Sequence, residues 1–155
     1  MVKRGSLFDG EWVRLDGRPV GKGRPRFTRR GVTYTDDVTR DWEESAAVRL
    51  VSAWAAPPAD GPVCVEVIQV EPRPKRFKGP PYRHPCPSGS RHPDLDNCIK
   101  ITVDACQTAA VFENDRQVTQ IHAVKVWAAA DEAPCVEVRV TPIPAHDPGV
   151  MWGTR

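Results

Sequence analysis

The chain has 155 residues, a length that fits one compact domain. Hydrophobic residues make up 40% of it and charged residues 27%, which excludes wholesale disorder. The 22 basic and 20 acidic side chains give a net charge of +2, but residues 1–103 carry +5 (18 − 13) and residues 104–155 carry −3 (4 − 7). The total charge alone therefore favours no particular partner.

No apolar run reaches the roughly 18–20 residues of a membrane span. Residues 1–5 lead into no apolar stretch of the kind found in signal peptides. We therefore expect a cytoplasmic protein that does not interact with membranes. Five cysteines without a Cys-x-x-Cys pair favour reduced thiols over a disulfide framework, and the four histidines supply no ligand pair at zinc spacing.

The first part of the chain predicts a short strand over residues 11–15 and a basic arm over residues 18–34. Residues 18–30 contain six basic and no acidic side chains. Arg30-Gly31 reads as the turn of a small hairpin. The arm is either a solvated loop or a surface that contacts nucleic-acid phosphates. In the second interpretation, the contacting residues are Lys22, Arg24, Arg26, Arg29 and Arg30.

A helix is predicted over residues 36–54, with Thr35 as its N-terminal cap and Pro57-Pro58 after its end. Residues four apart supply its expected core stripe: Val38, Trp42, Ala46, Leu50 and Trp54. Residues 63–68 then alternate as a strand with one strongly apolar face.

Residues 72–93 form a long basic loop that contains seven prolines. From residue 73 onward the loop has six basic side chains and no acidic one. We expect it to be mobile and without regular structure, and a loop of this length in a compact domain is often functional. Its candidate DNA-contacting residues are Arg73, Lys75, Arg76 and Lys78.

The segment from Pro93 to Ala105 carries the most chemistry. Asp94 and Asp96 are expected in extended chain, where residues two apart face the same side, with a helix beginning near Asp96. Lys100 and Asp104 follow at intervals of one helical turn. Together with Asp115, the two aspartates could supply the oxygen ligands that Mg²⁺ prefers, and Lys100 could stabilise charge on a phosphate.

Each of these residues also has an ordinary structural explanation. One aspartate of an Asp-x-Asp pair can simply cap the helix. Lys100 can be the i,i+4 partner of Asp96, and Asp115 can belong to a turn over residues 111–116. The residues alone leave both interpretations open.

The last part of the chain predicts a strand over Val118–Trp127, a turn at residues 131–134 and a final strand marked by Val136, Val138 and Val140. The sequence thus predicts a small α+β domain over residues 1–141, with a mixed or mainly antiparallel sheet packed with two helices. Residues 142–155 are expected to be a loosely ordered tail.

Two motifs resemble the RusA family of Holliday junction resolvases. The first is Asp94-Leu95-Asp96-Asn97 followed by Lys100, Asp104-Ala105 and Asn114-Asp115-x-Gln117-Val118. The second is Gly23-Arg24-Pro25-Arg26-Phe27 in the arm. The likeness extends from about residue 18 to residue 140, and it departs from the family at Asn114, where an Asp is usual, and in the longer loop at residues 72–93.

The resemblance implies a homodimeric, RusA-like crossover junction endodeoxyribonuclease. Such an enzyme uses Mg²⁺, with Mn²⁺ as a substitute, and cuts four-way DNA junctions by paired symmetric nicks in DNA recombination and repair. It would act in the cytoplasm of a bacterial or phage-infected cell. By motif, Asp94, Asp96 and Asp115 would be the catalytic metal ligands and Lys100 the catalytic lysine. The alternatives are a less selective flap or fork nuclease of phage origin and a non-catalytic DNA-binding protein.

Overall fold

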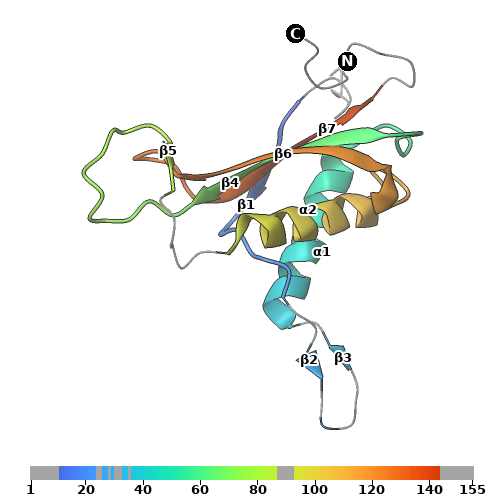
Figure 1. The fold of residues 1–155 in the computed structure, drawn as a ribbon, viewed down its shortest axis with the longest axis horizontal. Helices are drawn as coiled ribbons and strands as arrows, with labels where there is room; N and C mark the ends of the chain where they lie inside the picture. Colours follow the sequence, from blue (N-terminus) through green and yellow to red (C-terminus); the bar gives the residue numbers. More distant parts are fainter. Residues whose placement is uncertain are drawn as a thin grey trace.

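The structure of the protein, a computed structural model, describes residues 11–23, 26–27, 29, 33–34, 36–86 and 93–143. In these ranges, a five-stranded sheet is covered on one face by two helices, and a two-stranded hairpin precedes the first helix (Figure 1). The elements are β1 (Val13–Asp16), β2 (Arg26–Phe27), β3 (Thr33–Tyr34), α1 (Asp37–Ala53), β4 (Val63–Glu71), β5 (His84–Pro85), α2 (Leu95–Thr108), β6 (Val118–Trp127) and β7 (Cys135–Pro142).

The sheet has the order β1-β7-β4-β6-β5, with β4 at its centre. β4 runs antiparallel to β7 and parallel to β6, with Val63 opposite Val118 and Glu71 opposite Trp127. A parallel pair needs a long crossover, which the loop after β4 and helix α2 provide. The prediction of a small α+β domain with a mixed sheet and two helices is therefore confirmed.

Helix α1 begins one residue later than expected. Asp36 is its N-cap, and the Asp36 carboxylate accepts a hydrogen bond of 2.8 Å from the backbone N–H of Thr39. Thr35, the predicted cap, lies outside the described residues. Leu50 is fully buried as predicted, but Val38 is 66% exposed. Residues four apart in a helix differ in direction by about 40°, so a stripe at that spacing drifts off one face within three turns.

The core lies between the helices and the sheet. Alternate residues of β4 and β7 point into it, and they meet Leu50 of α1 and Cys98 and Cys106 of α2. The inward-facing valines of β4 and β7 are Val63, Val65, Val67, Val136, Val138 and Val140. All five cysteines are free, as the sequence predicts.

The loop after β4 is more ordered than its composition suggests. His84 and Pro85 form β5 and pair with the end of β6, so the expectation of no regular structure is wrong here. Arg73 fastens the loop to itself by hydrogen bonds to the carbonyls of Gly79 (2.9 Å) and Pro80 (2.7 Å). Proline content and charge could not reveal these contacts because they depend on the folded path of the loop.

Parts of several predicted segments lie outside the described residues: residues 87–92 of the basic loop, Arg24 and Arg30 of the arm, and residues 144–155 of the tail. The hairpin predicted around Arg30-Gly31 is confirmed by the pairing of β2 with β3. Within the described ranges, no helix has both the length and the apolar character needed to cross a membrane.

Candidate active site

Two exposed carboxylates lie at the start of α2. Asp94 occupies the N-cap position, but its side chain makes no capping hydrogen bond. Asp96 lies in the first turn of the helix, which begins at Leu95, within one residue of the expected start near Asp96. Asp94 is extended as expected, but Leu95 and Asp96 are already helical, so the helical turn sets the direction of the Asp96 side chain. The helix does not use the Asp94 carboxylate, so its oxygens are available to a ligand.

Lys100 lies one turn after Asp96 and is also exposed. Side chains four apart in a helix are neighbours on its surface, so the Lys100 ammonium belongs to the same face as the Asp96 carboxylate. The start of α2 thus combines two carboxylates and one ammonium group on accessible surface.

The backbone just before Asp94 rests on polar side chains from the sheet. The Pro93 carbonyl accepts hydrogen bonds from Nε2 of Gln69 (2.9 Å) and from Nζ of Lys125 (3.0 Å). Gln69 also donates to the Glu71 carboxylate. Gln69 and Glu71 are 0% and 1% exposed. They lie on the face of β4 that is turned toward the helices, where the preceding inward residues are valines. We call Gln69, Glu71 and Lys125 the polar floor. Their hydrogen bonds hold the backbone that leads into α2.

This polar floor was not anticipated from the sequence. Its one available signal was a break in the apolar alternation of β4 after Val67, where Gln69 and Glu71 replace valines on the inward face. Buried polar groups are normally hydrogen-bonded, so such a break indicates a specific partner elsewhere in the chain. The partner here is the carbonyl of Pro93, 24 residues after Gln69.

Asp115 lies at the opposite end of α2 from Asp94. It begins a short 3₁₀ helix that leads directly into β6. Gln117 of that helix donates to backbone carbonyls just before β4 begins, whereas Pro93 contacts Gln69 near the end of β4. Because α2 has 14 residues, each adding 1.5 Å, its two ends lie about 20 Å apart. One chain therefore does not bring Asp115 to Asp94 and Asp96.

Asn114 has a clear structural role beside Asp115. Its side chain accepts a hydrogen bond of 2.9 Å from the backbone N–H of Arg116. The Gln117 side chain reaches back to accept from the backbone N–H of Asn114 at 3.0 Å, completing a capping box. Asn114 thus stabilises the turn that carries Asp115, at a position where the family usually has Asp.

Lys22, predicted to contact DNA, is a partly buried residue that forms ion pairs with two carboxylates of the protein. Its ammonium group lies 2.7 Å from Oδ2 of Asp104 and 2.9 Å from Oε2 of Glu43. Burial alone would lower the pKa of Lys22, but the hydrogen bonds and charges of the two carboxylates outweigh burial and raise it. Lys22 therefore carries its charge in an ion-paired position between α1 and α2.

The other basic candidates differ in accessibility. Arg73 stacks over the Phe77 ring at 4.6 Å in addition to its loop hydrogen bonds. Exposed side chains are found at Arg29, Lys75, Arg76 and Lys78. The backbone of Arg26 lies in β2, but its side chain is outside the described part of the chain. A DNA contact by any of these residues stays a prediction.

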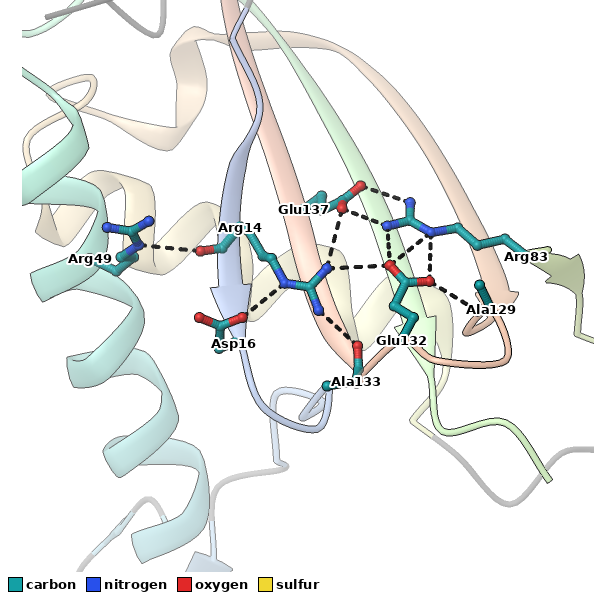
Figure 2. Close-up of polar contacts among 8 residues, drawn as sticks. All are labelled: Arg14, Asp16, Arg49, Arg83, Ala129, Glu132, Ala133 and Glu137. Atoms are coloured by element: carbon teal, nitrogen blue, oxygen red, sulfur yellow. Dashed lines mark hydrogen bonds and ion pairs between the residues drawn. The ribbon is translucent and has the colours of Figure 1, made fainter. Parts of the chain in front are cut away.

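A second group of possible metal ligands lies on the sheet face away from the helices. Glu132, Cys135 and Glu137 bring ligand atoms within 4.8 Å of one another. Figure 2 shows Arg14 and Arg83 pointing at the two carboxylates. The Arg83 hydrogen bonds lower the pKa of Glu132 to about 2, and burial raises the pKa of the Cys135 thiol to about 11. Arginine already neutralises these carboxylates, so we assign the group to structural ion pairing.

Comparison with known families identifies the class of protein. Residues 16–141 match the family described as Endodeoxyribonuclease RusA, a span that holds all the candidate catalytic residues and every element of the sheet except the first three residues of β1 and Pro142. A comparison with curated proteins found no match. The fold is accordingly that of an endodeoxyribonuclease domain.

The chain belongs to the RusA family of Holliday junction endonucleases, as the resemblance of its motifs predicts. Nucleases of this family are metal-dependent in general.

Proposed function

We propose that this protein is a Mg²⁺-dependent endonuclease that resolves Holliday junctions by paired symmetric nicks in DNA recombination and repair. Its site of action would be the cytoplasm of a bacterial or phage-infected cell. The observation that carries the proposal is the exposed start of α2, where the Asp94 carboxylate is unused by the helix and stands beside Asp96.

The residues at this helix start fit a magnesium ion. Mg²⁺ prefers oxygen ligands, usually binds through one or two carboxylates and keeps several waters. Asp94 and Asp96 supply two such carboxylates on accessible surface. A bound Mg²⁺, or Mn²⁺ in its place, would supply Lewis-acid stabilisation of charge on the phosphate that is cut.

The protein's own side chains supply the rest of the proposed chemistry. The Lys100 ammonium, one turn beyond Asp96, is placed to stabilise charge that develops on the phosphate. The polar floor beneath Pro93 would hold the Asp94 backbone in position, through the hydrogen bonds that Gln69 and Lys125 donate to the Pro93 carbonyl. Further basic side chains would hold the DNA backbone and set its register: Arg24, Arg26, Arg29, Arg30, Arg73, Lys75, Arg76 and Lys78.

The remote position of Asp115 supports a two-chain active site. If Asp115 is the third metal ligand, as its motif implies, the 14-residue helix α2 prevents it from acting with Asp94 of the same chain. In a two-fold dimer, each surface meets its counterpart reciprocally. A homodimer that places Asp115 of one copy beside Asp94 and Asp96 of the other would complete two identical sites, and these could make the two nicks.

A cleavage assay tests the proposed function. End-labelled four-way junction, flap, fork and duplex DNA are incubated with Mg²⁺ or with chelator, and Asp96→Asn serves as the matched variant. We expect symmetric, Mg²⁺-dependent nicks in the junction only, and junction binding without cutting by Asp96→Asn. Equal cutting of flaps or forks would favour a broader branched-DNA nuclease. Binding without any metal-dependent cutting would favour a DNA-binding protein.

A mixing experiment tests the two-chain site. Asp96→Asn and Asp115→Asn proteins are each expected to be inactive. Mixed dimers would contain one site with intact Asp94 and Asp96 from one copy and intact Asp115 from the other, so mixing should restore single-strand nicking. If each site lay within one chain, both sites of a mixed dimer would be damaged, and mixing would restore nothing.

A further inference from the structure

The segment Gly21–Gly23 of the basic arm packs against the start of α2. We propose that Lys22 is a positioning residue that locks the β2–β3 hairpin to both helices, and that it thereby sets where DNA held by the hairpin meets Asp94 and Asp96. The inference rests on the proposed nuclease function and assigns Lys22 a role other than the phosphate contact that its charge suggested.

The backbone of this segment is packed closely against α2. The Lys22 N–H donates a hydrogen bond of 3.0 Å to the carbonyl oxygen of Asn97, in the first turn of the helix. A Cβ atom at Gly21 would lie 3.1 Å from Cβ of Asn97 and 3.2 Å from Cβ of Pro93. A side chain at residue 21 would require Asn97 or Pro93 to shift by a few tenths of an ångström, so glycine favours this close approach to the start of α2.

The same segment is packed against the start of α1. A Cβ atom at Gly23 would approach Oδ2 of Asp36, the N-cap of α1, to 2.6 Å. Three residues beyond Gly23, the chain enters β2 of the hairpin. Figure 1 shows the hairpin next to the start of α1, on the side of the molecule away from the sheet. The two glycines thus lie where the arm packs tightly against the two helices.

The Lys22 side chain fastens this arrangement. Its ammonium group joins Asp104 of α2 to Glu43 of α1, and all three side chains are at least three-fifths buried. Asp104 is seven residues after Asn97, so Lys22 contacts α2 at two residues about two turns apart in the helix. One residue therefore contacts the first turn of α2 through its backbone and the middle of both helices through its ammonium group.

This placement separates Lys22 from a phosphate-binding lysine. A lysine on phosphate releases counterions from DNA, and its loss lowers the salt dependence of binding by about 0.9 in log–log slope. The charge of Lys22 is already matched by two carboxylates. Removing it should leave the salt slope intact but loosen the geometry between the hairpin and the cleavage site, to which reaction rates are sensitive.

The test compares Lys22→Met with Lys78→Met, an exposed lysine of the basic loop. Junction affinity is measured across a range of salt concentrations, and single-turnover cleavage is measured at saturating DNA. For Lys22→Met we expect an unchanged salt slope and a rate lowered roughly 10- to 100-fold. A slope that falls as it does in Lys78→Met, or a parental cleavage rate, would overturn the proposal.

Two further measurements separate positioning from loss of the fold. Lys22→Arg keeps a cation between Glu43 and Asp104, and it should restore most of the rate. Limited trypsin digestion within residues 24–35 should be several-fold faster in Lys22→Met than in the parent, and equal digestion would contradict the lock. The digestion does not depend on activity, so a parent protein that cuts no DNA would refute the proposed function and leave this test standing.

Discussion

Nζ of Lys125 donates a hydrogen bond of 3.0 Å to the carbonyl oxygen of Pro93, the residue before Asp94. Groups that orient a metal ligand typically change metal affinity 10- to 100-fold when they are removed. In Lys125→Met, we therefore expect the Mg²⁺ concentration for half-maximal junction cleavage to rise roughly 10- to 100-fold. A Mg²⁺ titration under single-turnover conditions measures this.

The control for Lys125 is Lys125→Arg, which keeps a cationic donor below Pro93 and should show an intermediate requirement. His122→Gln, an exposed change on the same strand, should behave as the parent does. If Lys125→Met cleaves at the parental Mg²⁺ concentration, the polar floor does not control the position of Asp94.

Lys100→Met tests the role of the exposed ammonium group. If it stabilises charge only as the phosphate reacts, its removal should lower the cleavage rate by about 100- to 1,000-fold with little change in junction affinity. Rate and affinity are measured separately, by single-turnover cleavage and by binding in chelator. Gln107→Met, further along the exposed face of α2, is the control. A loss of affinity equal to the loss of rate would make Lys100 a simple DNA contact.

Changing Lys75, Arg76 and Lys78 together to Gln tests the basic loop. If all three contact phosphates, the log–log salt slope of binding should decrease by about 2.7, from 0.9 per contact. The control is Arg49→Gln, an exposed residue of α1 that donates to the backbone of β1. A salt slope equal to that of the parent would remove the loop from the DNA interface.

Helix α1 offers a matched pair for the core. Leu50 is fully buried, whereas Val48 on the same helix is 68% exposed. Leu50→Ala leaves a cavity and should lower the free energy of unfolding by about 2–5 kcal/mol. Val48→Ala should change it by no more than about 0.5 kcal/mol. Urea unfolding measures both, and equal effects would contradict the observed packing of α1.

The Arg83–Glu132 pair predicts a pH dependence of stability. Arg83 lowers the pKa of Glu132 from 4.5 to about 2, so this carboxylate stabilises the fold above pH 4.5. That contribution should be lost progressively as the pH falls from 4.5 to about 2. Urea unfolding across this range should show a shallower decline in Arg83→Met than in the parent. Parallel curves for the two proteins would mean that Arg83 does not hold the pKa of Glu132 down.

Local patterns predicted the sheet strands well where periodicity was strong. The predicted bounds of β6 agree with the structure, and the valine alternation in β4 and β7 identified their inward faces. The motif at Asp94 and Asp96 indicated a helix start because carboxylates favour that position whether or not they bind metal. These features depend only on neighbours in the chain.

Other features depend on partners far away in sequence and could not be predicted. Gln69 and Lys125 share the Pro93 carbonyl only because β4 and β6 pair in a particular register. In the sequence, nothing distinguishes Lys22 from the other basic residues of the arm. Its ion pairs with Glu43 and Asp104 exist only in the folded protein. The same holds for Arg83, whose partners Glu132 and Glu137 lie 49 and 54 residues further along the chain.

The central position of β4 also has a consequence during synthesis. Its partners β6 and β7 end at Trp127 and Pro142, long after β4 itself ends at Glu71. At a translation rate of roughly 5–20 residues per second, the backbone hydrogen-bonding groups on both edges of β4 stay unpaired for several seconds until β6 and β7 are synthesised. An unpaired strand with a valine-rich face is a template for association between chains. The nascent protein is therefore most exposed to aggregation in the interval between the emergence of β4 and that of β7.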